Sequence, residues 1–555
     1  MEKELEAPAG PSSSARPEPV TDDDRELDPV RPLTKLRYLE VDSREGCNRF
    51  MSGDGFPVPE STIADIHAAI AAGRLTAESL TARYLERIEA YDPTLNAILT
   101  VNDAALDRAR ALDARFRDEG VVGPLHGIPI LLKDNQDTHD MPTTAGAVAL
   151  ADWVPDRDAT IVSRLRDAGA IVIGKTNLQE FSYGVDTISS LGGMTRNAYD
   201  VDYRPSGSSG GTAAAVAANF AVAGTGSDTC SSVRSPPAFN NLVGVRPTRG
   251  LVSRTGIIPL SESQDTAGPI ARTVSDAARL LEAMVGYDPT DPVTARGVDR
   301  VPRDGYRPQL DPNGLADARI GIARRFFGLQ DPDSARSTEA RAVTSVLEDA
   351  IDDMTAAGAT IVDPVEVVEH EDLLRARVIT YECARDVRRY FRTHDDPPFD
   401  SLEEIHATGA IVDPVADRFT ETGILAVDPD TLDEHTEYLR RLRLRGRLRD
   451  AALATMADRE LDAIAYPPST IPPVAIPDNQ PFTEMNCELA AHTGLPAIVV
   501  PAGFTDADLP VGIEFLGRPF DESGLFAIGS GFEHVTGHRR SPAGFGPLDE
   551  PAIHL

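Results

Sequence analysis

Two serine-rich turns enclose a run of small apolar residues near the middle of the chain. The first turn, 207–211, has no bulky side chain, so its backbone can turn sharply and its amides can approach a ligand. Thr212 predicts a helix start, and the Ala/Val run continues to Ala223. The second turn, 225–232, again collects hydroxyls and backbone amides. We expect the two turns to meet over a substrate carbonyl, where a serine nucleophile requires a base to accept its proton.

Lys133 is the candidate for that base. It follows five apolar residues, 128–132, and this pattern predicts a buried strand that ends in a charge. Removing a lysine from water disfavours its charged form, so burial lowers its pKa toward the range where it accepts protons near neutral pH.

Five motifs in order along the chain resemble those of the amidase signature enzymes. They are HGIPILLKDN (126–135), GKTNLQEFSYG (174–184), PSGSSGGTAAAVAA (205–218), GSDTCSSVRSPPAF (226–239) and GVRPTRG (244–250). Weaker similarity covers about 57–290 and 462–518, and SQDTAGPIARTVSDAA (263–278) looks most like the peptide-amidase branch. The resemblance implies an α/β fold with a central twisted mixed β-sheet flanked by helices on both sides. It also implies metal-free hydrolysis of a carboxylic amide to a carboxylate plus ammonia or an amine, without a cofactor.

Matched position by position, the resemblance implies a Ser–Ser–Lys triad. Ser232 falls where the family has its nucleophile, Ser208 where it has a bridging serine with a cis peptide bond, and Lys133 where it has the base. In this scheme an acyl-enzyme forms on Ser232, and Ser208 passes protons between Ser232 and Lys133. The implied oxyanion donors are the amides of Thr229, Cys230 and Ser231, and the implied supporting residues are Ser209, Gly210, Gly211, Asp228 and Arg234.

The chain departs from the family beside the nucleophile, because Cys230 and Ser231 stand where the family usually has two glycines. A side chain costs energy at any position that needs a positive φ, so these residues bear on the geometry of the oxyanion site. Asp228 and Arg234 flank the turn, and we expect an ion pair between them to fix its shape. Lys175 and His492 are more simply interpreted as structural residues than as further catalytic groups.

The remaining sequence predicts the organisation of the chain. A largely disordered acidic N-terminal tail is expected over 1–56, with a single domain over 57–555 and a variable helical region over about 290–460. Alternating strands and helices support the α/β class. Among these elements, Thr76 predicts the start of a helix that stops before Pro93.

Charge narrows the class of partner. The 555 residues contain 54 Lys and Arg against 88 Asp and Glu, a net charge of −34. Such a chain repels nucleic acid and anionic membranes, so we expect neither as a partner, and the six arginines of 440–449 are interpreted as a solvated helix face. With only four lysines, the composition fits adaptation to high salt; the alternative is an acidic protein from a GC-rich genome. The expected partner is a small-molecule or peptide amide, and homo-oligomers stay open.

The cysteines and histidines show no metal-ligand spacing, so no metal site is expected. Cys47, Cys230, Cys383 and Cys487 are widely spaced, which favours free thiols in a reducing cytoplasm. No apolar run is long enough to predict a membrane span.

Three alternatives to this hydrolase remain. Gly207–Gly211 also matches G-x-S-x-G, the nucleophile elbow of α/β-hydrolases, but the elbow must follow a buried strand, and 201–205 is polar and ends in proline. The chain is otherwise a glutaminase (A-type) subunit of a tRNA-dependent amidotransferase, or a catalytically inactive amidase-like binding protein.

Overall fold

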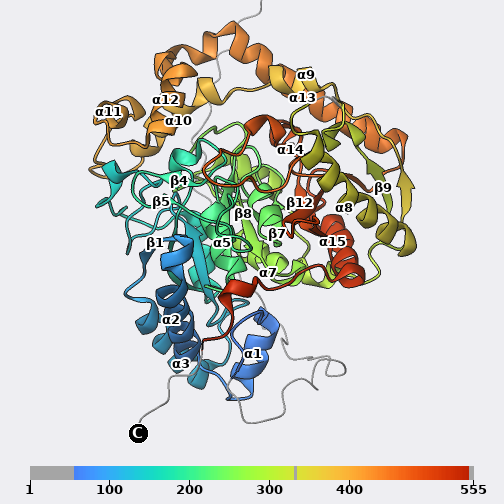
Figure 1. The fold of residues 1–555 in the computed structure, drawn as a ribbon. Helices are drawn as coiled ribbons and strands as arrows, with labels where there is room; N and C mark the ends of the chain where they lie inside the picture. The colour runs from blue at the N-terminus through green and yellow to red at the C-terminus, as the bar shows by residue number, and fades with distance from the viewer. Residues whose placement is uncertain (1–55, 331–333, 549–555) are drawn as a thin grey trace, which may run out of the picture. The chain divides into compact units, whose positions relative to one another are not determined.

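A single mixed sheet forms the centre of the protein in the computed structural model, which describes residues 56–330 and 334–548 (Figure 1). Its 11 strands run in the order β1-β3-β2-β6-β8-β7-β12-β13-β11-β9-β10, and β4 and β5 form a separate two-stranded sheet. The strands are β1 Ile98–Val101, β2 Pro129–Lys133, β3 Ile171–Thr176, β4 Ile188–Ser189, β5 Gly193–Met194, β6 Ala223–Asp228, β7 Val243–Arg246, β8 Thr266–Ala271, β9 Arg319–Ile322, β10 Thr360–Val362, β11 Ala463–Tyr466, β12 Ala497–Phe504 and β13 Pro510–Leu516.

Parallel and antiparallel pairing both occur in the sheet. β2 pairs in parallel with β3 and β6, and β9 pairs in parallel with β10 and β11. The strands between these groups pair antiparallel, from β6–β8 through β7, β12 and β13 to β11. The parallel pair β2–β6 places the carboxyl end of β2 beside that of β6, and these are the ends that carry Lys133 and the second serine-rich turn.

Helices cover both faces of the sheet, as the sequence predicts. They are α1 Ile63–Ala71, α2 Ala77–Leu95, α3 Ala105–Glu119, α4 Thr160–Asp167, α5 Gly210–Ala217, α6 Ser235–Phe239, α7 Val274–Met284, α8 Ser337–Ala356, α9 His370–Arg375, α10 Ile379–Phe391, α11 Leu402–Ala407, α12 Asp413–Glu421, α13 Thr436–Asp458, α14 Glu488–Thr493 and α15 Glu522–Thr536. Alternation along β12 shows the two layers. Val499 packs with Phe239 of α6, whereas Ile498 and Val500 join the cluster that contains α8 and α15.

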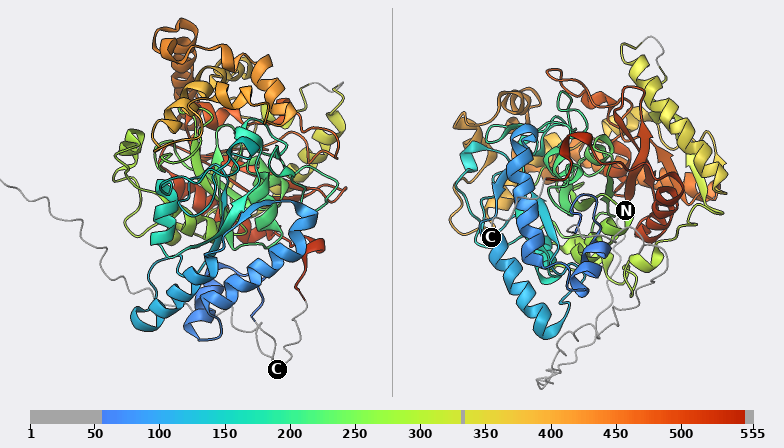
Figure 2. Two further views of the ribbon diagram at one scale, coloured as in Figure 1. Left: turned by 90° about the vertical axis from the view of Figure 1, so that its left-hand side faces the viewer. Right: turned by 60° about the horizontal axis from the view of Figure 1, so that its bottom comes forward.

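Helices α10, α11 and α12 lie together at the top of Figure 1 and again at the top of the left view of Figure 2. They have a hydrophobic core of their own, in which Phe391, Leu402 and Phe419 are buried. None of the helices in 56–330 and 334–548 is long and apolar enough to cross a membrane.

Three local predictions were wrong in detail. The helix capped by Thr76 runs through Pro93 to Leu95 instead of stopping before the proline. The helix that begins the Ala/Val run starts at Gly210 and ends at Ala217. Its last predicted residue, Ala223, instead begins β6, which extends to Asp228 and shortens the second serine-rich turn. The tail expected over 1–56 falls almost wholly outside the described residues.

Candidate active site

Lys133, Ser208 and Ser232 form one hydrogen-bonded row. The Lys133 Nζ lies 2.7 Å from Ser208 Oγ, and Ser208 Oγ lies 2.9 Å from Ser232 Oγ. The backbone N–H of Ser208 also donates to Ser232 Oγ at 2.9 Å. The Gly207–Ser208 peptide bond is cis, as the family resemblance implies for this serine. All three side chains are buried, and Ser232 keeps 7% of its surface exposed.

Burial adjusts Lys133 for proton transfer. It lowers the pKa of this lysine to about 7, although the carboxylates of Asp228 and Asp265 act in the opposite direction. Both the charged and the neutral amine are therefore populated near neutral pH, which is what a general base requires.

The sheet positions these groups. Lys133 is the last residue of β2, Ser208 precedes the first turn of α5, and Ser232 lies in the turn between β6 and α6. Two glycines permit this close arrangement. A Cβ on Gly226 would lie 2.7 Å from Ser209 Oγ, and one on Gly211 would lie 2.1 Å from the carbonyl oxygen of Asn177. The segment before Ser209 contains no strand, so the nucleophile-elbow alternative lacks the strand that it requires.

The backbone amides of residues 229–232 are unpaired. Within the described part of the chain, none of these four N–H groups donates a hydrogen bond, although the segment is largely buried. Consecutive free amides at a buried turn form a site for an anionic oxygen. Neither Cys230 nor Ser231 has a positive φ, so the energetic cost of side chains at the two family glycine positions does not arise.

Cys230 is not a free thiol, which corrects the sequence interpretation. It forms a disulfide with Cys487, 257 residues further along the chain. Cys383 is a free, buried thiol, and Cys47 lies outside the described residues. Widely spaced cysteines carry no pairing information, so the sequence could not show this cross-link. A reducing cytoplasm is no longer indicated, because that expectation depended on free thiols.

An ion-pair network braces the same turn. The pair expected between Asp228 and Arg234 is present, with Arg234 Nε 3.2 Å from Asp228 Oδ2 and both side chains inaccessible to solvent. Arg234 also contacts Glu514 at 2.6 Å and donates to the Cys487 carbonyl, while Arg246 contacts Asp228 at 2.5 Å. Burial raises the pKa of Asp228, but Arg234 and Arg246 outweigh it, and this pKa lies below its ordinary value. Glu514 was not predicted from the sequence, although a single glutamate inside the apolar run 510–516 was a signal for a buried cation partner.

The other charged candidates lie apart from the row. Lys175 Nζ contacts Asp134 at 3.1 Å and donates to Pro142 and Thr143, so it supports the loop after β2. His492 is buried in α14, where burial lowers its pKa well below the ordinary value. These environments agree with the structural interpretation of both residues.

Two polar residues that were not predicted from the sequence contact Lys133 directly or through one neighbour. Ser227 Oγ lies 2.8 Å from Lys133 Nζ and accepts a hydrogen bond from Asn135 Nδ2 at 3.0 Å. Both residues, with Thr229, line a cavity of about 700 Å³ that α10 closes with Arg389 and Tyr390. The cavity therefore reaches the row from the Lys133 side.

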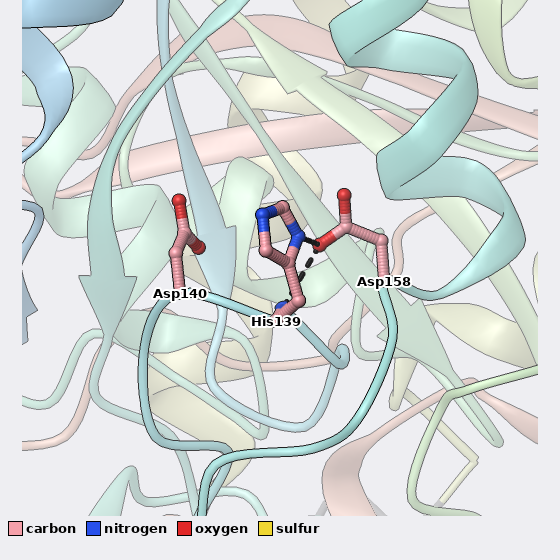
Figure 3. Close-up of side chains that lie close together, drawn as sticks. All are labelled: His139, Asp140 and Asp158. Atoms are coloured by element: carbon pink, nitrogen blue, oxygen red, sulfur yellow. Dashed lines mark hydrogen bonds and ion pairs between the residues drawn. The ribbon is translucent and has the colours of Figure 1, made fainter.

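A cluster of His139, Asp140 and Asp158 brings three potential metal-ligand atoms within 4.8 Å of one another (Figure 3). The sequence spacing did not indicate it. Arg166 contacts both carboxylates, at 2.7 Å from Asp140 and 3.1 Å from Asp158, and His139 Nδ1 is 2.8 Å from Asp158. Because a guanidinium already neutralises the carboxylates, we interpret the cluster as an ion-pair network.

Comparison with known proteins gives consistent matches. A family model described as Amidase matches residues 79–526. The A-type subunit of glutamyl-tRNA(Gln) amidotransferase from Chloroflexus aggregans is 36% identical over 503 residues, which cover 87% of this chain and 98% of that protein. The structure of native peptide amidase from Stenotrophomonas maltophilia matches with a TM-score of 0.76 at 38% identity, covering 88% of this chain and 99% of that chain. The A-type subunit of glutamyl-tRNA(Gln) amidotransferase from Thermotoga maritima matches with a TM-score of 0.68 at 28% identity, covering 87% of this chain and 98% of that chain.

Proposed function

Since the chain belongs to the amidase family, we propose that it hydrolyses a carboxylic amide through an acyl-enzyme on Ser232. The row Lys133–Ser208–Ser232 beside four unpaired amides is the observation that carries this proposal. It supplies a nucleophile, a base and a site for the developing oxyanion within one buried turn.

The direction of the hydrogen bonds depends on the charge of Lys133. A protonated Lys133 donates to Ser208, which donates to Ser232, so Ser232 keeps its own proton. Neutral Lys133 instead accepts from Ser208, and Ser208 accepts from Ser232. As Ser232 Oγ bonds to the carbonyl carbon, its proton passes to Ser208 and the proton of Ser208 passes to Lys133, while the amides of 229–232 bind the oxyanion.

The second half of the reaction reverses the transfer. The proton returns through Ser208 to the amide nitrogen, the C–N bond breaks, and ammonia or an amine leaves. Water then attacks the acyl carbon and gives its proton to Ser208, and Ser232 departs to release the carboxylic acid. Each serine ends with the proton that it had at the start.

The cavity favours a substrate larger than a single amino acid. Its volume of about 700 Å³ lies within the range of about 300–1,000 Å³ found for sites that enclose drug-sized ligands. A neighbour with 38% identity is a peptide amidase, solved in complex with the competitive inhibitor chymostatin. We therefore place peptide amides first among the candidate substrates.

The second candidate is the glutaminase subunit of a tRNA-dependent amidotransferase, because relatives at 36% identity carry that name. The two functions differ in what they need. An independent amidase releases ammonia or amine from peptide or aryl amides on its own, whereas a glutaminase subunit releases ammonia from glutamine and co-purifies with partner chains.

A serine-directed fluorophosphonate followed by peptide mapping tests the chemistry. We expect the label on Ser232, with loss of both labelling and amide hydrolysis in Ser232→Ala. Ser209→Ala is the matched control, because Ser209 is the nucleophile of the elbow alternative and contacts only the Ser227 carbonyl, at 3.4 Å. Label on Ser209 would contradict the proposal, and no label at all would favour an inactive binding protein. A screen of amides in concentrated KCl, scored by released ammonia or amine, then identifies the substrate.

A further inference from the structure

One arginine of the run 440–449 is buried, contrary to the interpretation of that run as a solvated helix face. Arg443, Arg447 and Arg449 of α13 are exposed, but only 6% of Arg445 is accessible. Burying a guanidinium is costly unless hydrogen bonds satisfy its donors. Arg445 donates to the Ala376 carbonyl at 2.9 Å and to Ser263 Oγ at 2.6 Å, and its remaining nitrogen, Nη2, donates to Gln264 Oε1.

Gln264 connects this arginine to the turn that carries the free amides. Its Nε2 donates to the carbonyl oxygen of Thr229 at 2.7 Å. The C=O of Thr229 and the N–H of Cys230 belong to one planar peptide unit and point in opposite directions when that unit is trans. Fixing the Thr229 carbonyl on the Gln264 side therefore aims the Cys230 N–H to the other side of the turn.

Arg445 decides which way Gln264 faces. A glutamine amide has a donor end and an acceptor end, and rotation by 180° exchanges them. Arg445 has only donors, so it holds Oε1 toward itself and leaves Nε2 for Thr229. Burial lowers the pKa of Arg445 to about 10, which is still above neutral pH, so the guanidinium keeps its protons.

The helical region also holds the turn from a second side. Thr229 Oγ1 donates to Asp265 Oδ1 at 2.6 Å, and Asp265 accepts from the backbone N–H of Ser261 at 2.9 Å. Ser261 Oγ in turn donates to Glu382 of α10 at 2.5 Å. Both routes begin on helices of the region expected to vary with substrate, and both end on Thr229.

We infer that Arg445 is a positioning residue for the oxyanion turn, acting through Gln264 on the Thr229–Cys230 peptide. The inference rests on the proposed hydrolysis at Ser232. It assigns the helical region a role in the rate of the chemical step, in addition to enclosing the substrate.

The test compares Arg445→Met, Gln264→Leu and the double variant on a peptide amide, with Arg447→Met as the matched control on the exposed face of α13. Losing a directly bonded oxyanion donor costs about 10²–10³ in kcat, so loss of its support is expected to lower kcat at least ~10-fold with KM nearly unchanged. Affinity for a peptide aldehyde, whose adduct with the serine presents an oxyanion, should fall in parallel. Because both residues act in series, the double variant should lose no more than Gln264→Leu alone.

Several results would overturn the inference. A raised KM with unchanged kcat in Arg445→Met would show that the residue serves binding, and additive losses in the double variant would show that it does not act through Gln264. Should Arg445→Met fail to fold, Gln264→Leu carries the test alone, and normal kcat there refutes it. A Ser232→Ala protein that still hydrolyses the amide would instead overturn the proposed function, and the inference with it.

Discussion

At the scale of single residues, the four lysines among 54 basic residues are informative. Arginine has replaced lysine almost everywhere in this chain. Lys133 and Lys175 are both fully buried, and each donates to specific oxygens. Lysine differs from arginine in that a buried ammonium can release its proton near neutral pH, whereas guanidinium cannot.

Lys133→Arg keeps the charge but removes the base. We expect a folded variant that loses at least ~10² in kcat, because the guanidinium cannot accept a proton from Ser208. Lys175→Arg is the matched control and should lower the melting temperature more than kcat, since Lys175 contacts the loop after β2 and not the serines. Near-normal turnover in folded Lys133→Arg would show that the lysine is a structural cation.

The pH dependence of the rate follows from the same group. Burial lowers the pKa of Lys133 to about 7, and only neutral Lys133 accepts a proton, so kcat/KM should rise with pH and level off above about 7. The unfolded lysine titrates near 10.5. The unfolded chain therefore binds more protons between about 7 and 10.5, and this group's contribution to stability increases with pH across that window. Rates that are flat from pH 5 to 8 would exclude Lys133 as the base.

At the scale of elements, the sequence predicted the buried strand that ends at Lys133, because its apolar run is unbroken. It also predicted the two serine-bearing turns. It failed where tertiary contacts override local signals: Pro93 lies inside α2, and 223–228 forms a strand between β2 and β8 despite its glycines and polar residues. The braces of the active turn, Cys487, Glu514 and Arg445, come from distant elements, and no local pattern records such pairings.

The disulfide should stabilise the protein and the turn together. Cys487→Ser is expected to lower the free energy of unfolding by about 2–4 kcal/mol, because the cross-link restricts the unfolded chain, and to lower kcat through loss of a brace on Cys230. A phosphine reductant should reproduce both effects in the wild-type protein and leave Cys487→Ser unchanged. Equal stability of wild type with and without reductant would contradict this role.

At the scale of the whole molecule, the net charge of −34 sets the response to salt. The screening length falls from about 10 Å at 0.1 M to about 3 Å at 1 M, so repulsion between surface carboxylates weakens as salt rises. We expect the melting temperature to increase between 0.1 and 3 M KCl. A flat or falling melting temperature would reject adaptation to high salt.

The ion pair between Arg234 and Glu514 has a consequence for the time at which the protein becomes active during its synthesis. Lys133, Ser208 and Ser232 all precede residue 235, but Glu514 follows Arg234 by 280 residues. At about 5–20 residues per second, the ribosome needs roughly 14–56 s to add that length of chain. Throughout this interval the nascent chain holds the whole triad while Arg234 lacks one of its two carboxylates and Cys230 lacks its partner. We therefore expect catalytic competence to appear only as translation nears its end.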